Sequence, residues 1–322
     1  MNAYQRTAAL KGGIQLDVFT AIGEGNRTAK AIAERCRASE RGMRILCDYL
    51  VITGFLAKDG GSYRLTPDSA MFLDRRSPAY LGTAERFLTS PLLTGAFEDV
   101  AAMVRKGGEV MSEKGTMDPN HPVWVEFARS MAPMMAMPAE AIAKMLGASQ
   151  GGKRKVLDIA AGHGLFGITI AKHNPQATIF ALDWPAVLEV AKENAQKAGV
   201  TARYQTIPGS AFEAAFGTGY DVVLLTNFLH HFDAATCEQL LRKVHAALGS
   251  GGRALTLEFV PNEDRLSPPA AAAFSFTMLG TTPSGDAYTF SEFDRMFHNA
   301  GFTRSELHPL PPFPGQVIIS QK

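Results

Sequence analysis

VLDIAAGHGLFGITIA, residues 156–171, joins a short apolar run to a helix-like run through a loop that carries Gly162, Gly164 and Gly167. Glycines in this G-x-G-x-x-G spacing let the backbone approach a ligand closely at the start of a helix. Alone the spacing is a weak signal, because nicotinamide-dependent enzymes also carry it. The stretch predicts a strand, a ligand-binding loop and a helix.

Further apolar runs follow this stretch and alternate with helical patterns. From residue 155 onward the strand-like runs are KVLDIA (155–160), ATIFALD (177–183), ARYQTIP (202–208), YDVVLLTN (220–227) and RALTLEFV (253–260). Such alternation is typical of a doubly wound α/β domain. We therefore expect a Rossmann-like, mostly parallel sheet over residues 151–322.

The N-terminal part has a different pattern. Helical periodicity covers residues 8–22, 28–38 and 39–55, with Thr28 and Ser39 as candidate caps of the last two segments. FLAKDGGSYRLT (55–66) then predicts a hairpin that turns at Asp59-Gly60-Gly61. Three helices and a hairpin are typical of a winged helix, so we expect an α-rich domain over residues 1–90.

Residues 91–150 are predicted to be a helical connector. PLLTGAFEDVAAMVRKG (91–107) and HPVWVEFARSMAPMMAMPAEAIAKML (121–146) have helical patterns, and the loop GEVMSEKGTMDPN (108–120) separates them. GASQGGKRK (147–155) is expected to link the connector to the sheet domain.

Composition excludes several classes of protein. The 322 residues carry a net charge of +1, and 46% of them are hydrophobic, so nothing favours a nucleic-acid partner. The three cysteines, Cys36, Cys47 and Cys237, are far apart and have no metal-ligand spacing. No apolar run approaches the ~18 residues of a membrane span, and the segment MNAYQRTAALKGG (1–13) lacks the apolar core and the small-residue cleavage site of a secretory signal. A cytoplasmic protein without a membrane partner is expected.

Two carboxylates end the first two predicted strands. Asp158 lies just before the glycine loop, where it would repel a diphosphate and attract the cationic groups of S-adenosylmethionine. Asp183 ends the second strand, where a carboxylate can accept hydrogen bonds from ribose hydroxyls. The pair favours S-adenosylmethionine over a nicotinamide cofactor. The plainer alternative is that both carboxylates cap local turns.

With these motifs the chain resembles the class I S-adenosylmethionine-dependent methyltransferases, in particular the dimeric small-molecule O-methyltransferases that include plant caffeate and bacterial antibiotic-tailoring enzymes. The resemblance rests, in chain order, on VLDIAAGHGLFG, LDWPAVLEVA, GSAFE, LHHFDAATCEQLLRKVHAALGSGGRALTLE and YTFSEFDRMFHNAGF. It implies a winged-helix dimerisation domain and a homodimer. It also implies that S-adenosylmethionine is converted to S-adenosylhomocysteine while a hydroxyl of a small, apolar, aromatic acceptor is methylated.

The resemblance also implies a catalytic pair. A histidine at the end of the fourth strand is the family's general base, and this position is His230. The carboxylate that orients the base corresponds to Glu258, at the end of the fifth strand. A neutral imidazole can take a proton from a phenol, and a carboxylate behind it stabilises the imidazolium. If the chain is still extended here, His231 points to the opposite face and serves the acceptor.

The remaining site residues are implied by the same resemblance. The expected cofactor-binding residues are Asp158, Ala160, Gly162, Gly164, Asp183, Trp184, Ser210, Ala211, Phe212, Thr226 and Asn227. The expected acceptor-binding residues are Phe127, Met131, His231 and Met278. No metal is expected, since the two histidines lack a further ligand at a suitable spacing.

The chain departs from the family pattern at several positions. Ala287, with Asp286 beside it, stands where the family has a second supporting carboxylate. Ser210 and Thr226 replace an Asp and a Lys that some members use toward the cofactor.

These departures leave alternatives open, as does the sequence as a whole. A carbon or nitrogen methyltransferase on the same scaffold is the first, and a nicotinamide oxidoreductase is less favoured because of Asp158. A DNA-binding regulator is the third, although the segment 39–55 has only Arg41 and Arg44 as basic residues and also carries Asp48. The sequence does not name the acceptor.

Overall fold

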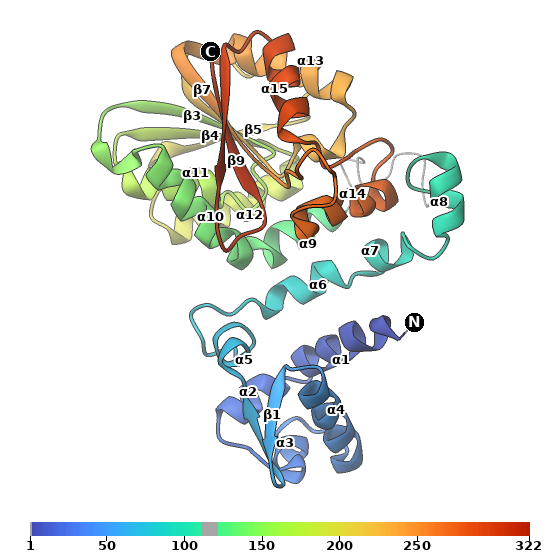
Figure 1. Ribbon diagram of the computed structural model, residues 1–322. Helices are drawn as coiled ribbons and strands as arrows, with labels where there is room; N and C mark the ends of the chain where they lie inside the picture. Colours follow the sequence, from blue (N-terminus) through green and yellow to red (C-terminus); the bar gives the residue numbers. More distant parts are fainter. Residues whose placement is uncertain (1, 111–121) are drawn as a thin grey trace. The chain divides into compact units, whose positions relative to one another are not determined.

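The computed structural model describes residues 2–110 and 122–322, and the chain divides into two compact units, Met1–Ser90 and Pro91–Lys322 (Figure 1). Most of the predicted loop at residues 108–120 lies outside the described residues. The predicted boundary at residue 150, between a connector and the sheet domain, stays a prediction. In the described parts of the chain no helix is long and apolar enough to cross a membrane.

The first unit consists of short helices and one hairpin. Its α-helices and strands are α1 (Ala3–Gln15), α2 (Val18–Gly23), α3 (Ala29–Arg35), α4 (Glu40–Ile52), β1 (Leu56–Asp59), β2 (Ser62–Leu65), α5 (Pro67–Phe72) and α6 (Glu85–Leu88). The predicted caps are confirmed, because Thr28 Oγ1 accepts the amide of Ala31 and Ser39 Oγ that of Gly42. The hairpin turns at Gly60, whose φ is +57°.

The single helix expected over residues 8–22 is wrong. The chain forms two helices there, and Asp17, with φ of +61°, separates α1 from α2. Aspartate tolerates this left-handed conformation better than most residues, so it permits a sharp change of direction. The break lets Ile14, Val18, Phe19 and Ile22 all enter the core of the unit.

The second unit begins with helices and continues into the sheet domain. The helices before the sheet are α7 (Pro91–Gly95), α8 (Val100–Lys106), α9 (Val123–Ser130) and α10 (Ala132–Met145). The helices that follow the first strand of this sheet are α11 (Leu165–His173), α12 (Pro185–Lys197), α13 (Ala234–Ala247), α14 (Pro269–Thr281) and α15 (Phe290–Asn299).

One seven-stranded sheet has the order β5-β4-β3-β6-β7-β9-β8. Its members are β3 (Arg154–Ile159), β4 (Ala177–Asp183), β5 (Tyr204–Pro208), β6 (Tyr220–Thr226), β7 (Leu248–Glu258), β8 (Arg304–Pro309) and β9 (Gln316–Gln321). The first five strands are parallel, as predicted, whereas β9 is antiparallel to β7 and β8 is antiparallel to β9. Sequence patterns did not indicate this antiparallel pair.

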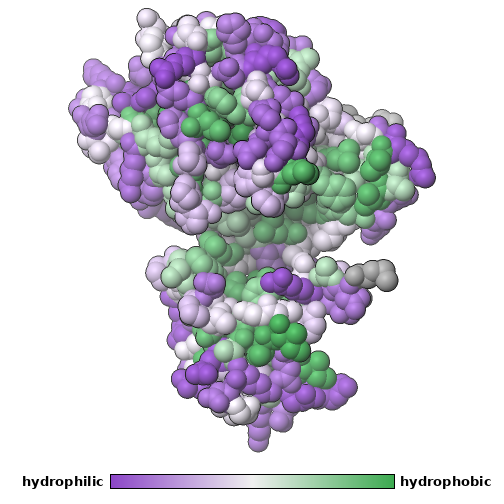
Figure 2. Space-filling model, in the orientation of Figure 1, coloured by the Kyte–Doolittle hydropathy of each residue, from purple (hydrophilic) through white to green (hydrophobic). Residues whose placement is uncertain are grey.

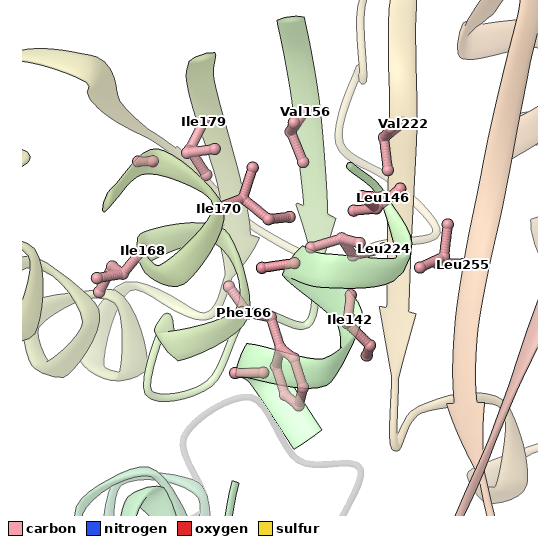
Figure 3. Packing of buried hydrophobic residues seen from close by; sticks show 14 of the residues in the cluster. Ile142, Leu146, Val156, Phe166, Ile168, Ile170, Ile179, Val222, Leu224 and Leu255 are labelled. Atoms are coloured by element: carbon pink, nitrogen blue, oxygen red, sulfur yellow. The ribbon is translucent and has the colours of Figure 1, made fainter. Parts of the chain in front are cut away.

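Alternate side chains of the strands fill a core on each face of the sheet. Figure 3 shows Ile142 of α10, Leu146 just after this helix, and Phe166, Ile168 and Ile170 of α11 packed with strand residues such as Val156, Ile179 and Leu224. On the opposite face, Leu157, Val223 and Leu225 pack with α13 and α15. Helices on both faces confirm the predicted doubly wound arrangement.

The order of the strands reverses beside β3, because β4 and β5 lie to one side of it and β6 and β7 to the other. In open α/β sheets ligands bind at the carboxyl ends of the strands, next to such a switch point. The glycine loop follows β3, and the two histidines follow β6. Both candidate motifs therefore lie at the edge of the sheet where a ligand is expected.

Candidate active site

The glycine loop is shaped by close packing at two of its three glycines. A Cβ at Gly164, whose φ is +75°, would stand 2.5 Å from Tyr204 Oη, and one at Gly167 would stand 2.6 Å from Ile179 Cγ2. Gly162 differs, because its φ is +56° but the nearest described atoms would be 3.9 Å or more from a Cβ. The left-handed conformation of Gly162, and not a lack of space, therefore favours glycine here, and the absence of a side chain lets a ligand approach the backbone closely.

Asp158 lies beneath the loop. Its side chain is fully buried, and Oδ2 accepts the amide of Gly167 at 3.1 Å, while Oδ1 has no hydrogen-bond partner among the described residues. Burial raises the pKa of Asp158 to about 7. The carboxyl group therefore fixes the start of α11, and the predicted contact of Asp158 with the cofactor stays a prediction.

Replacing Asp158 by Asn should change how stability depends on pH. Because its pKa is raised, the folded protein binds more protons than the unfolded chain between about pH 4 and 7, so the free energy of unfolding falls as pH rises through this window. Between pH 5.5 and 8 the free energy of unfolding of the wild type should fall by about 2 kcal/mol more than that of Asp158→Asn. Denaturant unfolding of both proteins at the two pH values measures the difference, and identical losses would show that Asp158 ionises normally.

Asp183 links the glycine loop to the end of β4. Its Oδ2 accepts the amide of Gly162 at 2.8 Å, and Oδ1 accepts the amide of Trp184 at 2.7 Å. Desolvation by the surrounding protein raises the pKa of Asp183 to about 6. Part of this residue nevertheless remains accessible to solvent. Each carboxylate oxygen has a second lone pair, so further donors can bind here.

The loop after β5 holds Ser210, Ala211 and Phe212 next to Asp183. The amide of Gly209 donates to Asp183 O at 3.0 Å, and Ser210 Oγ accepts the amide of Phe212 at 3.2 Å. Lys243 of α13, which sequence analysis missed, donates from Nζ to the carbonyl oxygens of Ala211 (2.9 Å) and Phe212 (3.0 Å). No local sequence signal identifies Lys243, because only the fold brings α13 to this loop.

The His230 turn, residues 228–232, follows the end of β6. Glu258 Oε2 lies 2.5 Å from His230 Nδ1, and Glu258 Oε1 accepts the amides of Phe228 (2.9 Å) and Leu229 (2.8 Å). Both side chains are buried, with His230 4% and Glu258 1% exposed. One carboxylate therefore fixes both the backbone of the turn and the imidazole of His230.

The expectation that His231 continues an extended strand is wrong. β6 ends at Thr226, and residues 229–231 form a 3₁₀ turn. The turn is stabilised because the Glu258 carboxylate accepts hydrogen bonds from the amides of both Phe228 and Leu229. The two imidazoles lie side by side, with ring centroids 4.3 Å apart. Burial and the neighbouring His230 lower the pKa of His231 well below its ordinary value, so the ring is neutral. His231 Nδ1 is buried, and the described chain offers it no hydrogen-bond partner.

Aromatic rings flank both histidines. Trp124 of α9 lies 5.3 Å from His231, and Phe274 of α14 lies 4.9 Å from His230, measured between ring centroids. Phe259 stacks on Phe274 at 4.1 Å. Sequence analysis did not single out these three rings, because they lie in separate segments and only the fold brings them to one place.

The other predicted site residues occupy several positions in the second unit. Phe127 lies near the glycine loop, 4.0 Å from where a Cβ of Gly162 would stand. Met131, between α9 and α10, and Met278 of α14 are both buried. The acceptor-binding function of both methionines stays a prediction.

Three further predicted cofactor residues lie at strand ends. Ala160 follows β3, Thr226 ends β6 and Asn227 follows it. Ala160 and Asn227 both have φ of +53°, an uncommon conformation that often marks functional sites. The amide of Asn227 donates to Leu257 O at 2.8 Å, which ties the end of β6 to β7.

Of the two residues at the position of the family's second carboxylate, neither brings a carboxylate into contact with His230 in the described structure. Ala287 is fully buried, and Asp286 is half-exposed and pairs with Arg265 at 3.4 Å. Glu258 is thus the carboxylate that contacts His230. Within residues 2–110 and 122–322, no group of three His, Cys, Asp or Glu side chains could hold a metal ion.

Comparison with known proteins identifies the chain. A family model described as an O-methyltransferase domain matches residues 113–303, and one described as an O-methyltransferase dimerisation domain matches residues 1–75. The chain belongs to the O-methyltransferase family. The predicted family, enzyme class and fold are thereby confirmed, and S-adenosylmethionine is the family's methyl donor, as predicted.

Individual relatives of this O-methyltransferase cover almost its whole length. A 3-hydroxy-5-methyl-1-naphthoate 3-O-methyltransferase of Streptomyces sahachiroi is 28% identical over 302 residues, 92% of this chain and 86% of its own. A candidate O-methyltransferase of known structure from Nostoc punctiforme is 58% identical, with a TM-score of 0.96 over 100% of this chain and 97% of its own. Human N-acetylserotonin methyltransferase, solved with S-adenosylmethionine, has the same fold at 22% identity, with a TM-score of 0.84 over 100% and 95% of the two chains.

Proposed function

We propose that this O-methyltransferase methylates a hydroxyl of a small, apolar, aromatic acceptor, with His230 as the general base and Glu258 as the residue that orients it. The observation that carries the proposal is the buried contact between Glu258 Oε2 and His230 Nδ1 at the carboxyl end of β6. This contact stands next to the switch point of the sheet, where a ligand is expected.

The residues around the glycine loop fit S-adenosylmethionine. Gly162 offers bare backbone, and Asp183 keeps lone pairs that suit the two hydroxyls of a ribose. Ala211 and Phe212 stand on the loop that Lys243 fixes, beside Asp183. When bound, the cofactor supplies a methyl group that is already activated by a positive sulfur. The protein must therefore bind and orient the acceptor and remove its proton.

Replacing Asp183 by Ala should weaken binding of S-adenosylhomocysteine by roughly 1 to 3 kcal/mol, because the ribose loses an acceptor and the Gly162 amide loses its partner. Titration calorimetry measures the change. Asp221→Ala is the matched control, since Asp221 also accepts a backbone amide, that of Lys155 at 2.7 Å, but at the opposite end of the sheet. Equal affinities in wild type and Asp183→Ala would exclude Asp183 from the cofactor site.

Glu258 determines which nitrogen of His230 acts as the base. An ionised carboxylate only accepts hydrogen bonds, so Nδ1 must carry the proton that it shares with Glu258 Oε2. In the neutral ring Nε2 is then the nitrogen with the free lone pair. His230 Nε2 takes the proton from the acceptor hydroxyl, and the adjacent carboxylate stabilises the charge that the imidazole gains.

The surroundings of the base favour an aromatic acceptor. Trp124 and Phe274 flank the pair of histidines, and flat apolar side chains pack well against aromatic rings. The relative from Streptomyces sahachiroi supports this choice, since its name describes a hydroxylated naphthoate as its acceptor.

A screen of phenols and quinols with labelled cofactor, followed by locating the methyl group in each product, tests the proposed reaction. Methyl groups on oxygen are expected. Products methylated only on carbon or nitrogen would contradict the proposal and favour the alternative transferase.

We also propose that the first unit forms a homodimer. Ile45 and Ile52 are 44% and 79% exposed and lie seven residues apart, on one side of α4. Figure 2 shows hydrophobic residues on the surface of this unit. The dimerisation model matches the same part of the chain, residues 1–75. Apolar side chains that are this exposed are typical of an interface.

Light scattering at micromolar concentration should give twice the chain mass of 34.7 kDa. The double variant Ile45→Asp/Ile52→Asp should shift the protein to a monomer, because charges would be buried at the interface. Leu266→Asp, at a residue that is 76% exposed in the second unit, is the control and should remain a dimer. A wild-type monomer would overturn the proposal.

A further inference from the structure

A segment near the C-terminus packs directly against the His230 turn. Gly285 approaches so closely that a Cβ there would overlap the carbonyl oxygen of His230, which leaves no room for a side chain. Three residues later, the hydroxyl of Tyr288 donates to the carbonyl oxygen of Phe232 at 2.6 Å. The turn is therefore bounded by Glu258 on one side and by the segment 285–288 on another.

The hydrogen bond of Tyr288 is the strong contact at Phe232 O. The other donor that the structure records for this oxygen is the thiol of Cys237, at 3.8 Å, which is a weak interaction. Tyr288 is 7% exposed, and its ring packs edge-on against Phe293. Burial raises the pKa of Tyr288, so its hydroxyl keeps its proton and remains a donor.

Contacts on both sides of Tyr288 hold it in place. Before it, Thr282 Oγ1 accepts the amide of Gly285 at 2.8 Å, and Asp286 pairs with Arg265. After it, Thr289 and Glu292 form a capping box at the start of α15. A side chain anchored in this way can fix a neighbouring turn, because it does not move with that turn.

We propose that Tyr288 is a positioning residue that fixes the His230 turn through its hydrogen bond to Phe232 O. The inference rests on the proposed function of His230 as the base. Ala287, at the position of the family's second carboxylate, has no group that can support the base, and Asp286 is engaged with Arg265. Tyr288 supports the turn through the backbone instead of through the imidazole.

Tyr288→Phe removes only the hydroxyl and should shift the turn slightly. Small displacements of a catalytic group lower rates strongly, so kcat with a weakly acidic phenol should fall about 10-fold. The KM for S-adenosylmethionine should not change, since Tyr288 has no contact with the glycine loop in the described structure. With a nitrophenol that is ionised at the assay pH, kcat should stay near the wild-type value, because no proton has to be removed.

Tyr220→Phe is the matched control. Tyr220 is 1% exposed, and its hydroxyl also donates to a backbone carbonyl, that of Phe216, at 2.6 Å. It lies at the opposite end of β6 from His230. Its removal should cost similar thermal stability and leave kcat unchanged with both phenols. Gly285→Ala is a second test and should lower kcat more than Tyr288→Phe does, with the same dependence on phenol acidity.

The possible results separate the inference from the proposed function. Equal kcat values in Tyr288→Phe and Tyr220→Phe, or a loss in Tyr288→Phe of the same size with both phenols, would overturn the inference and leave His230 as the base. Full turnover by His230→Ala with the weakly acidic phenol would overturn the proposed function, and the inference with it.

Discussion

Turnover of a weakly acidic phenol should fall by about 10² to 10⁴ when His230 is replaced by Ala, the usual effect of losing a general base. The imidazole is buried against Glu258, and the described structure places no other carboxylate on His230. Binding of S-adenosylhomocysteine should not change, because most of the predicted cofactor contacts belong to the loops after β3, β4 and β5, and the two at the end of β6, Thr226 and Asn227, precede the His230 turn. Initial rates at saturating cofactor, together with calorimetry, separate the two effects.

His245→Ala is a control for the loss of a histidine, since His245 of α13 packs edge-on against Phe302 and has no contact with Glu258. It should keep wild-type turnover. A His230→Ala protein that binds S-adenosylhomocysteine much more weakly than the wild type would show that His230 belongs to the cofactor site.

Replacing Glu258 by Gln should lower turnover by about 10³ to 10⁴, because it inverts the protonation of the imidazole. The amide oxygen can still accept the amides of Phe228 and Leu229, so the NH₂ group must face His230 Nδ1. Nδ1 then becomes the acceptor, Nε2 carries the proton, and the ring cannot remove a proton from the acceptor. The variant has nearly the shape of the wild type, so thermal stability should change little.

Glu258→Ala tests the second function of the carboxylate, which is to stabilise the backbone of the His230 turn as well as to orient the imidazole. It removes all three contacts of the carboxylate, so both turnover and the melting temperature should fall. Wild-type turnover by Glu258→Gln would contradict the assigned tautomer and remove Glu258 from the mechanism.

Sequence patterns predicted the parallel strands well, because each combines an apolar run with a strand end that carries a polar residue. ATIFALD matches β4 at both ends, Ala177–Asp183. The patterns did not predict β8 and β9, whose sequences mix apolar and polar residues and which are defined mainly by pairing with β7. Pairing between distant segments leaves little trace in a local pattern.

Local patterns also did not predict where the chain changes direction. Asp17 interrupts a helical pattern that is otherwise continuous, and it does so through a left-handed conformation that many sequences avoid. His231 follows an apolar strand pattern, but Glu258, 27 residues further along the chain, turns the backbone by binding two amides. Neither turn is encoded by the residues next to it alone.

The candidate site was predictable where a motif carries it and not where only packing does. The glycine loop, Asp158 and Asp183 follow from a motif and its spacing, and the pairing of His230 with Glu258 follows from the resemblance to the family. Lys243, Tyr288, Trp124 and Phe274 lie on four separate segments, and each acts through a backbone carbonyl or a ring contact. Such contacts have no characteristic spacing, so sequence analysis cannot find them.

The most direct test of the proposed mechanism is the ratio of wild-type to His230→Gln turnover over a series of phenols of increasing acidity, at one pH and saturating cofactor. Glutamine keeps much of the polar character of histidine but cannot act as a base at neutral pH. If His230 removes the proton, the ratio should be about 10² to 10⁴ for weakly acidic phenols and approach one for phenols that are already ionised. A ratio that is the same for every phenol, or that is near one for the weakly acidic phenols, would contradict the assignment of His230 as the base.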